Sequence, residues 1–305
     1  MAPGMRPRRI LFITSSRIGD AVLSTGLLDH LLRTEPEARF TIVCGLVAEG
    51  VFARMPRCER VIAMDKRRGG LHWLDLWRMT ATTWWDLVVD IRGSALAWLL
   101  RTRRRAVMRP RTGHKTAQLA AILNLDPPPL PVAWTAPADR ARAQVLLGPA
   151  GGPVIALAPT ANWAEKVWPA ERFAALYERL AAGPLAGARA AILGGPGEVE
   201  RAMAAPLLER LPDAIDLVGR LSLAEAAACL QRSVLFVGND SGLMHLAAAA
   251  GAPTLGLFGP TPADQYAPAG RCTSIAQART GRMVDLSVEM VLAEAERLVM
   301  AAAAA

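Results

Sequence analysis

The residues best placed to do chemistry form a polar turn between an apolar strand and an Ala-rich helix. Val234 to Val237 end at Gly238-Asn239-Asp240-Ser241-Gly242, and a second apolar segment, Thr254 to Phe258, follows the helix. A helix that begins in this turn directs its unpaired backbone N–H groups and the positive end of its dipole beyond the end of the strand. The turn therefore predicts an anion site that fits a phosphate. The alternative is that Asp240 or Ser241 only caps a structural helix.

A carboxylate stands at a second helix start. Asp20 follows the apolar strand Ile10 to Thr14 and precedes a helix in which Leu23, Leu27, Leu28 and Leu31 share one face. One interpretation is a helix cap. The other is a general base that the helix N-terminus keeps ionised. The carboxylate is then ready to accept a proton at pH 7, but it is a weak base. Such a base suits a reaction whose transition state is already strongly electrophilic.

Lys166 lies in the loop from Ala158 to Pro169, between a strand and a helix, and is one of only three lysines in the chain. A lysine here places a point charge on a phosphate oxygen, and the alternative is an ordinary exposed lysine. Thr160, at the end of the same strand, adds a hydroxyl donor.

Two further signals, one from Glu198 or Glu200 and one from His245, point less specifically to a functional role. Glu198 follows the strand Ala190 to Leu193, where acidic side chains of α/β domains bind ribose hydroxyls, and Glu200 competes with it for this role. His245, one turn into the helix after Gly242, either packs against the turn or orients Asp240 or a phosphate.

Short apolar runs separated by helix-length segments must position these residues, and they predict two doubly wound α/β sheets. Pro-rich residues 126–131 and Gly-rich residues 148–153 flank a short helix. We therefore expect domains over residues 1–145 and 150–305 that face each other across a cleft, since ligands bind beyond the carboxyl ends of such strands. The expected strands are Ile10–Thr14, Phe40–Cys44, Arg60–Met64, Leu87–Ile91 and Ala106–Met108 in the first half, and Val154–Ala158, Ala190–Leu193, Ile215–Val218, Val234–Val237 and Thr254–Phe258 in the second.

The composition of the chain and the motifs that it lacks narrow the range of possible functions. The chain has 305 residues, 52% of them hydrophobic, and no N-terminal run long enough for a signal peptide or a membrane span, so we expect a cytoplasmic protein. Its four cysteines are widely spaced, which disfavours disulfides and zinc. G-x-G-x-x-G, P-loop and D-x-D motifs are all missing. We therefore expect no cofactor and no metal, and an anion neutralised by protein groups.

The charge is uneven along the chain. Residues 1–150 carry 23 Lys and Arg against 12 Asp and Glu, whereas residues 151–305 carry 12 against 15. The first half therefore favours an anionic partner: nucleic acid, a membrane surface or an acidic substrate. The densest cluster, Arg101 to Lys115, has few aromatic residues and matches no nucleic-acid module, so we expect no nucleic-acid partner. A solvated basic loop is the alternative.

Four segments, in order, resemble glycosyltransferase family 9, the heptosyltransferases of the lipopolysaccharide inner core. They are SSRIGD at 15–20, K-x-W-P-x-x-R-F at 166–173, LGGPGE at 193–198 and GNDSGLMHLAAAAGAPTLGLFGPT at 238–261. The resemblance runs from Ile10 to about Tyr266 and covers both halves. It implies a GT-B fold with two Rossmann-like domains, an ADP-activated heptose as donor, and inversion at the anomeric carbon without a metal.

The resemblance also implies roles for the matched residues. Asp20 takes the proton of the acceptor hydroxyl, Lys166 and Thr160 hold the departing diphosphate, and Glu198 binds the ribose. The helix start at Ser241, Gly242 and Leu243 donates to the β-phosphate, with Asp240 and His245 completing the donor site. These roles agree with a transition state that resembles an oxocarbenium ion, which needs a positive leaving-group site and only a modest base.

The acceptor implied is an anionic lipid-linked glycan at the cytoplasmic face of the inner membrane, where the enzyme would be peripheral. We expect Arg92, Arg111, His114 and Lys115 to bind it; Kdo, a first heptose and a capsular glycan all remain open. Two other functions stay as alternatives. One is a family relative that uses another nucleotide sugar for capsule or surface glycan, and the other is a noncatalytic nucleotide-binding protein.

Overall fold

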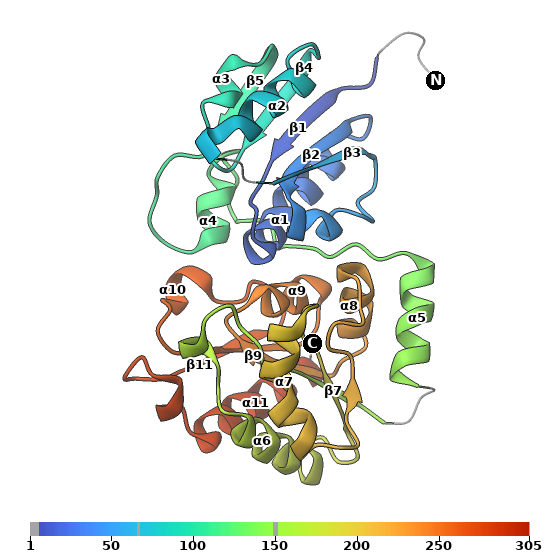
Figure 1. The fold of residues 1–305 in the computed structure, drawn as a ribbon, viewed down its shortest axis with the longest axis vertical. Helices are drawn as coiled ribbons and strands as arrows, with labels where there is room; N and C mark the ends of the chain where they lie inside the picture. Colours follow the sequence, from blue (N-terminus) through green and yellow to red (C-terminus); the bar gives the residue numbers. More distant parts are fainter. Residues whose placement is uncertain (1–5, 66–67, 149–151, 305) are drawn as a thin grey trace. The chain divides into compact units, whose positions relative to one another are not determined.

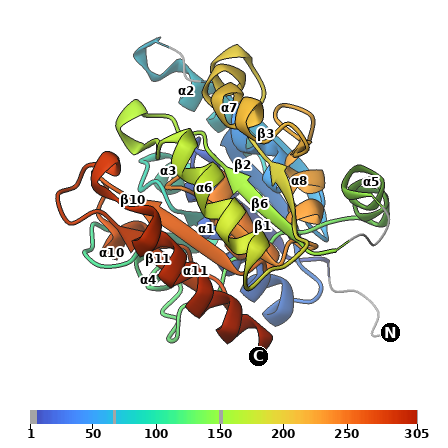
Figure 2. The same ribbon diagram turned by 90° about the horizontal axis from the view of Figure 1, so that it is seen from below.

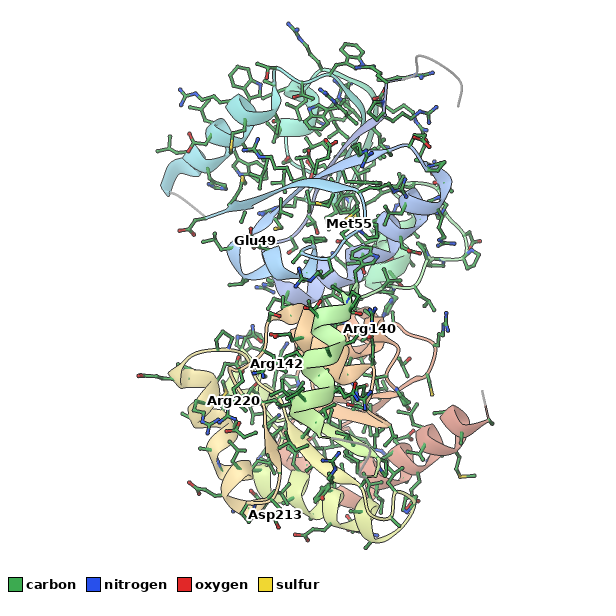
Figure 3. The ribbon with its side chains drawn as sticks, turned by 90° about the vertical axis from the view of Figure 1, so that its right-hand side faces the viewer. Glu49, Met55, Arg140, Arg142, Asp213 and Arg220 are labelled. Atoms are coloured by element: carbon green, nitrogen blue, oxygen red, sulfur yellow. The ribbon has the colours of Figure 1, made fainter. Side chains whose placement is uncertain are left out.

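The computed structural model describes residues 6–65, 68–148 and 152–304, which form two compact α/β units divided after Pro131 (Figure 1). The expected division into residues 1–145 and 150–305 differs in the placement of one helix. Helix α5 (Pro137–Leu147) packs against α8 (Leu223–Leu230) and so belongs to the second unit. Figure 3 turns α5 toward the viewer, with Arg140 and Arg142 labelled on it.

The first unit is built on a five-stranded parallel sheet in the order β3-β2-β1-β4-β5. Residues Ile10 to Ile13 of β1 are all buried, because the central strand of a parallel sheet is covered on both faces. The strands are β1 (Arg9–Ile13), β2 (Arg39–Gly45), β3 (Cys58–Met64), β4 (Trp85–Asp90) and β5 (Thr102–Val107). The helices are α1 (Ile18–Thr34), α2 (Leu71–Thr80), α3 (Leu96–Leu99) and α4 (Lys115–Ala120), with 3-10 turns at Leu46–Val51 and Arg68–Gly70.

The second unit has a six-stranded parallel sheet in the order β11-β10-β9-β6-β7-β8. Helices α6 and α11 lie side by side on one face of it and enclose a core with α7 (Figure 2). The strands are β6 (Val154–Ala158), β7 (Arg189–Ile192), β8 (Ile215–Asp216), β9 (Leu235–Asn239), β10 (Thr254–Phe258) and β11 (Thr273–Gln277). The remaining helices are α6 (Ala170–Ala182), α7 (Glu198–Arg210), α9 (Gly242–Ala250), α10 (Ala263–Tyr266) and α11 (Val288–Ala303), with 3-10 turns at Ala164–Lys166 and Met283–Asp285.

The prediction of two doubly wound α/β sheets is confirmed, with two differences at sheet edges. Strand β5 begins at Thr102 rather than at Ala106, so Arg103 to Arg105 lie in a strand and not in a loop. Strand β11 was not predicted from the sequence. Both are edge strands, which face solvent along one side and therefore carry polar residues instead of an apolar run.

Both sheets reverse their strand order at one point, between β1 and β4 in the first unit and between β6 and β9 in the second. In open α/β sheets, ligands bind beyond the carboxyl ends of the strands at this reversal. The segments that follow β1, β4, β6 and β9 are therefore where each unit is expected to bind its ligand.

Arg57 closes the carboxyl end of α1. Its guanidinium donates to the main-chain oxygens of Leu32, Glu35 (2.7 Å) and Pro36. A cation is favourable beside the free carbonyls at the end of a helix. We expect Arg57→Ala to lower the free energy of unfolding by about 2 kcal/mol, since hydrogen bonds from charged groups contribute roughly 1.5–3 kcal/mol.

Urea unfolding followed by circular dichroism measures this loss, with Arg39→Ala as the matched control. Arg39 is an exposed arginine at the start of β2, and its removal should change stability by no more than about 0.5 kcal/mol. Equal losses in the two variants would show that the Arg57 contacts contribute nothing specific.

Candidate functional site

Asp20 lies in the first turn of α1, just beyond the carboxyl end of β1. The N-cap residue of this helix is Arg17, and no side chain caps it. The half-buried Asp20 carboxylate accepts a hydrogen bond from Ser15 Oγ (3.3 Å), which itself accepts one from the Arg17 backbone N–H (3.2 Å). Asp20 is therefore not the N-cap, and its carboxylate is held by a hydroxyl at the strand reversal of the first unit.

A small pocket of about 10 Å³, room for about one water molecule, lies beyond the carboxyl ends of the strands of the first unit, lined in part by Thr14, Ser16, His72, Trp73 and Arg92. The Arg92 guanidinium carbon lies 5.2 Å from the centroid of the Trp73 ring, within the range of a cation–π contact. Of the four residues expected to bind an acceptor, Arg92 is the one that lines this pocket.

Asp90 shapes the loop that carries Arg92, a role that we did not predict from the sequence. As the last residue of β4, it is fully buried and accepts hydrogen bonds from the Arg92 N–H (2.8 Å), the Ser94 N–H (2.8 Å) and the Ser94 hydroxyl. Burial raises the pKa of Asp90, and the hydrogen bonds oppose this rise. The signal in the sequence was a carboxylate at the end of an apolar strand, followed by Arg92, Gly93 and Ser94.

The other expected acceptor residues do not share the pocket of Arg92. Arg111 lines a different cavity of about 220 Å³, together with Arg105, Arg109, Gln118 and Asn124. His114 is the N-cap of α4: its Nδ1 accepts from the Thr116 N–H (3.3 Å) and lies 2.7 Å from Thr116 Oγ1. Lys115 is the first residue of this helix. His114 thus has a local structural role that the sequence pattern did not indicate.

Lys166 and Asp240, 74 residues apart, form a nearly buried ion pair in the second unit. Lys166 Nζ lies 2.7 Å from Asp240 Oδ2, and the two side chains are 14% and 9% exposed. Lys166 ends the 3-10 turn after β6, and Asp240 directly follows β9. The Lys166 ammonium also lies 5.4 Å from the centroid of the Trp163 ring. Sequence reasoning selected both charged residues, but not their pairing.

Asn239 fastens the loop of Lys166 to the end of β9. This fully buried amide donates to the main-chain oxygen of Pro159 (2.9 Å) and accepts from the backbone N–H of Trp168 (3.0 Å). Trp168 is itself buried, and its indole N–H donates to the Leu286 oxygen (2.8 Å). Sequence reasoning treated Asn239 only as a turn residue. The available signal was its place at the end of a buried strand, where an amide must find partners.

Helix α9 begins beside this ion pair. Ser241 is its N-cap residue, but its side chain makes no capping hydrogen bond, and its Oγ is buried with no partner among the described residues. The first backbone N–H groups of a helix have no partner within it and carry the positive end of its dipole. An unpartnered hydroxyl, open N–H groups and the Lys166 ammonium together suit an anion with several oxygens. His245 is buried one turn further along α9.

The remaining expected residues lie at the carboxyl ends of β6 and β7. Thr160 is buried two residues beyond β6. Glu200 accepts from the Gly195 N–H (3.2 Å), which commits its carboxylate to the glycine loop. Glu198, the first residue of α7, is exposed. Of the two competing glutamates, Glu198 is therefore the one whose carboxylate is not held by this loop.

In the described parts of the chain the cysteines are free thiols, and the metal-binding side chains form no cluster. Cys44 and Cys229 are buried, which raises their pKa values to about 12 and about 11. Across residues 6–65, 68–148 and 152–304, no three His, Cys, Asp or Glu side chains are grouped so that they would hold a metal ion. Within the same ranges, every helix is too short or too polar to cross a membrane.

Comparison with known proteins gives consistent matches. The family model described as glycosyltransferase family 9 (heptosyltransferase) matches residues 77–295. Lipopolysaccharide heptosyltransferase 1 of Pseudomonas aeruginosa is 30% identical over 296 residues, which cover 83% of this chain and 79% of that protein.

Two solved structures share the fold. The glycosyl transferase family 9 protein from Veillonella parvula superposes with a TM-score of 0.82 at 22% identity, covering 96% of this chain and 97% of that one. The Escherichia coli heptosyltransferase WaaC with ADP superposes with a TM-score of 0.73 at 20% identity, covering 95% and 99%.

Proposed function

The chain belongs to glycosyltransferase family 9, the family of the lipopolysaccharide heptosyltransferases, and from this premise we propose that it transfers heptose from an ADP-activated donor to the lipopolysaccharide inner core. The transfer inverts the anomeric carbon and uses no metal ion. The observation that carries the proposal is the Lys166–Asp240 ion pair beside the open N-terminus of α9, at the strand reversal of the second unit.

The second unit binds the donor in this proposal. The diphosphate lies at the start of α9, where the N–H groups of Gly242 and Leu243 and the Ser241 hydroxyl donate to it. Lys166 supplies a positive charge, and Thr160 adds a hydroxyl. Glu198 binds the ribose. Support for ADP comes from the Escherichia coli neighbour, which was solved with that nucleotide.

In the transfer step, one bond forms at the acceptor and another breaks at the donor. The oxygen of an acceptor hydroxyl forms a bond to the anomeric carbon while the bond from that carbon to the diphosphate oxygen breaks. The hydroxyl proton goes to the Asp20 carboxylate, and the electron pair of the broken bond leaves with ADP. Because the transition state resembles an oxocarbenium ion, stabilising the departing diphosphate lowers the activation barrier most, and a weak base suffices.

The acceptor is an anionic lipid-linked glycan, with Kdo or heptose as the sugar that is extended. Arg92 beside Trp73 is suited to it, since a guanidinium binds carboxylate or phosphate and an aromatic ring packs against a sugar face. Arg111 and Lys115 lie further along the same unit and extend its positive charge. Such an acceptor places the enzyme at the cytoplasmic face of the inner membrane, as a peripheral protein.

Titration calorimetry with ADP, UDP and GDP in the presence of EDTA tests the donor assignment. We expect ADP to bind at least about tenfold more tightly than the other two, a difference of about 1.4 kcal/mol, with no loss on adding EDTA. Binding of UDP or GDP alone would select a family relative that uses another nucleotide sugar. ADP binding without turnover of any ADP-sugar, across a panel of inner-core acceptors, would select a noncatalytic nucleotide-binding protein.

A further inference from the structure

Helices α2 and α3 of the first unit present large apolar side chains to solvent. In α2, Leu71, Leu74 and Trp77 are exposed and lie on the arc opposite the fully buried Leu76, as helical spacing dictates. In α3, Trp98 and Leu99 are 65% and 66% exposed, although their neighbours Leu96 and Ala97 are buried. Each helix therefore has one face in the core and large apolar residues outside; on the outer arc of α2 they lie beside Arg78, which pairs with Asp75 (3.8 Å).

These exposed residues lie on neighbouring elements at the surface of the first unit. Helices α2 and α3 contact each other, and both pack on one core that contains Leu76, Trp85 and Leu96 (Figure 1). We call this surface the tryptophan face; its residues are Leu71, Leu74, Trp77, Trp98 and Leu99. Large exposed apolar side chains gathered on neighbouring elements are typical of interaction sites, whereas single ones are common on any protein surface.

Arginines of the edge strand β5 border the tryptophan face. The Arg105 guanidinium carbon lies 5.8 Å from the centroid of the Trp98 ring, and its nitrogens donate to the oxygens of Ala97 and Leu100, which ties α3 to the strand. Because side chains alternate along a strand, Arg103 lies on the same side as Arg105. Arg101 and Arg103 are exposed and form no ion pair within the described parts of the chain.

The combination of groups indicates which partner fits. Tryptophan is enriched where proteins meet the headgroup region of a bilayer, because its ring is apolar and its N–H is polar. Unpaired arginines attract the phosphates of anionic lipids. A second copy of the chain fits less well, since a symmetric contact would bring the arginines of both copies together.

The tryptophan face also adjoins the pocket of the first unit. His72 and Trp73, which line that pocket, belong to the same helix as Leu71, Leu74 and Trp77. One helix therefore carries both pocket residues and exposed apolar residues. A bilayer at the tryptophan face would lie next to the pocket, where the headgroup of a lipid-linked acceptor begins.

We propose that the tryptophan face, with Arg101 and Arg103 at its border, docks the first unit on an anionic phospholipid bilayer. The aromatic and aliphatic side chains enter the headgroup region, and the arginines bind lipid phosphates. The inference rests on the proposed function only for the identity of the membrane, because docking itself requires neither donor nor transfer.

Co-sedimentation with vesicles of phosphatidylethanolamine and phosphatidylglycerol tests the proposal, with vesicles of phosphatidylcholine alone for comparison. We expect the wild type to bind the anionic vesicles and salt to weaken the binding. Both W98S/L99S and R101E/R103E should lower the vesicle affinity by about tenfold or more. The control V145S/M300S changes two exposed apolar residues of the second unit and should bind like the wild type.

Three outcomes would overturn the proposal. The first is that the wild type does not bind anionic vesicles, and the second is that the variants of the tryptophan face bind them as the wild type does. The third is a dimer in sedimentation equilibrium that the W98S/L99S substitutions dissociate. Circular dichroism and urea unfolding show whether each variant is folded, and the milder W77S supplies a second test if W98S/L99S is not. Transfer to a delipidated acceptor separates the two claims, because failure of the proposed function abolishes that transfer without changing vesicle binding.

Discussion

The substitution Asp20→Ala is expected to lower the rate of glycosyl transfer by about 10³-fold, within the range contributed by a general base. In the proposed mechanism the acceptor proton then has no side chain to receive it, while the proposed donor site, which lies in the second unit, is untouched. ADP affinity should therefore stay at the wild-type value. The fold should be little affected, since Asp20 is not the N-cap of α1 and its carboxylate bonds only to the Ser15 hydroxyl among the described residues.

Asp29→Ala is the matched control. It removes a carboxylate from the same helix, where Asp29 pairs, among the described residues, only with Arg33 near the surface, and should leave transfer unchanged. Steady-state rates with the preferred sugar donor, together with calorimetry for ADP, separate the two roles of Asp20. If Asp20→Ala lost donor binding and transfer to the same extent, the residue would be structural and the base would lie elsewhere.

The second large effect is expected at the ion pair of the second unit. Lys166→Ala should lower transfer by about 10²-fold, because the departing diphosphate loses a preorganised cation. ADP affinity should fall as well. Stability should also drop, by roughly 3 kcal/mol, since the nearly buried Asp240 carboxylate loses its partner.

A paired variant distinguishes these two consequences of losing Lys166. K166M/D240N removes both charges, so it should recover most of the lost stability but none of the lost transfer. Arg232→Ala, near the amino end of β9 and so at the opposite end of that strand from the N-terminus of α9, is the control for a lost positive charge in the same unit. Recovery of transfer in the double variant would show that Lys166 acts only by neutralising Asp240, which would contradict its role on the diphosphate.

Much of the positioning of the site was predictable from local patterns. In a βαβ series the strands run parallel, so their carboxyl ends meet at one edge of the sheet. A polar residue just after an apolar run must then lie at that edge, as Asp20, Thr160 and Asp240 do. The missing capping hydrogen bond of Ser241 could not be predicted, because serine is a preferred N-cap residue and the sequence does not show whether its hydroxyl bonds to the helix.

Other features depend on which distant segments pack together. Strand order brings the ends of β6 and β9 side by side, and only then do Lys166 and Asp240 pair and Asn239 join the two loops. The same dependence explains why α5 belongs to the second unit, since its partner α8 lies much further along the chain. Sequence spacing carries no information about such contacts, because the free energy that selects them comes from burial in the assembled core.

The sequence by itself therefore determined the α/β class, the strands of the sheet centres and the residues that follow them, because these depend on short-range periodicity and chain direction. The tertiary structure alone decided the strand order, the pairing of Lys166 with Asp240, the separation of Arg92 from Arg111 and the exposure of Trp98. Burial and pairing are properties of surfaces that meet only after folding. An apolar residue such as Trp98 looks the same in the sequence whether it faces the core or the solvent.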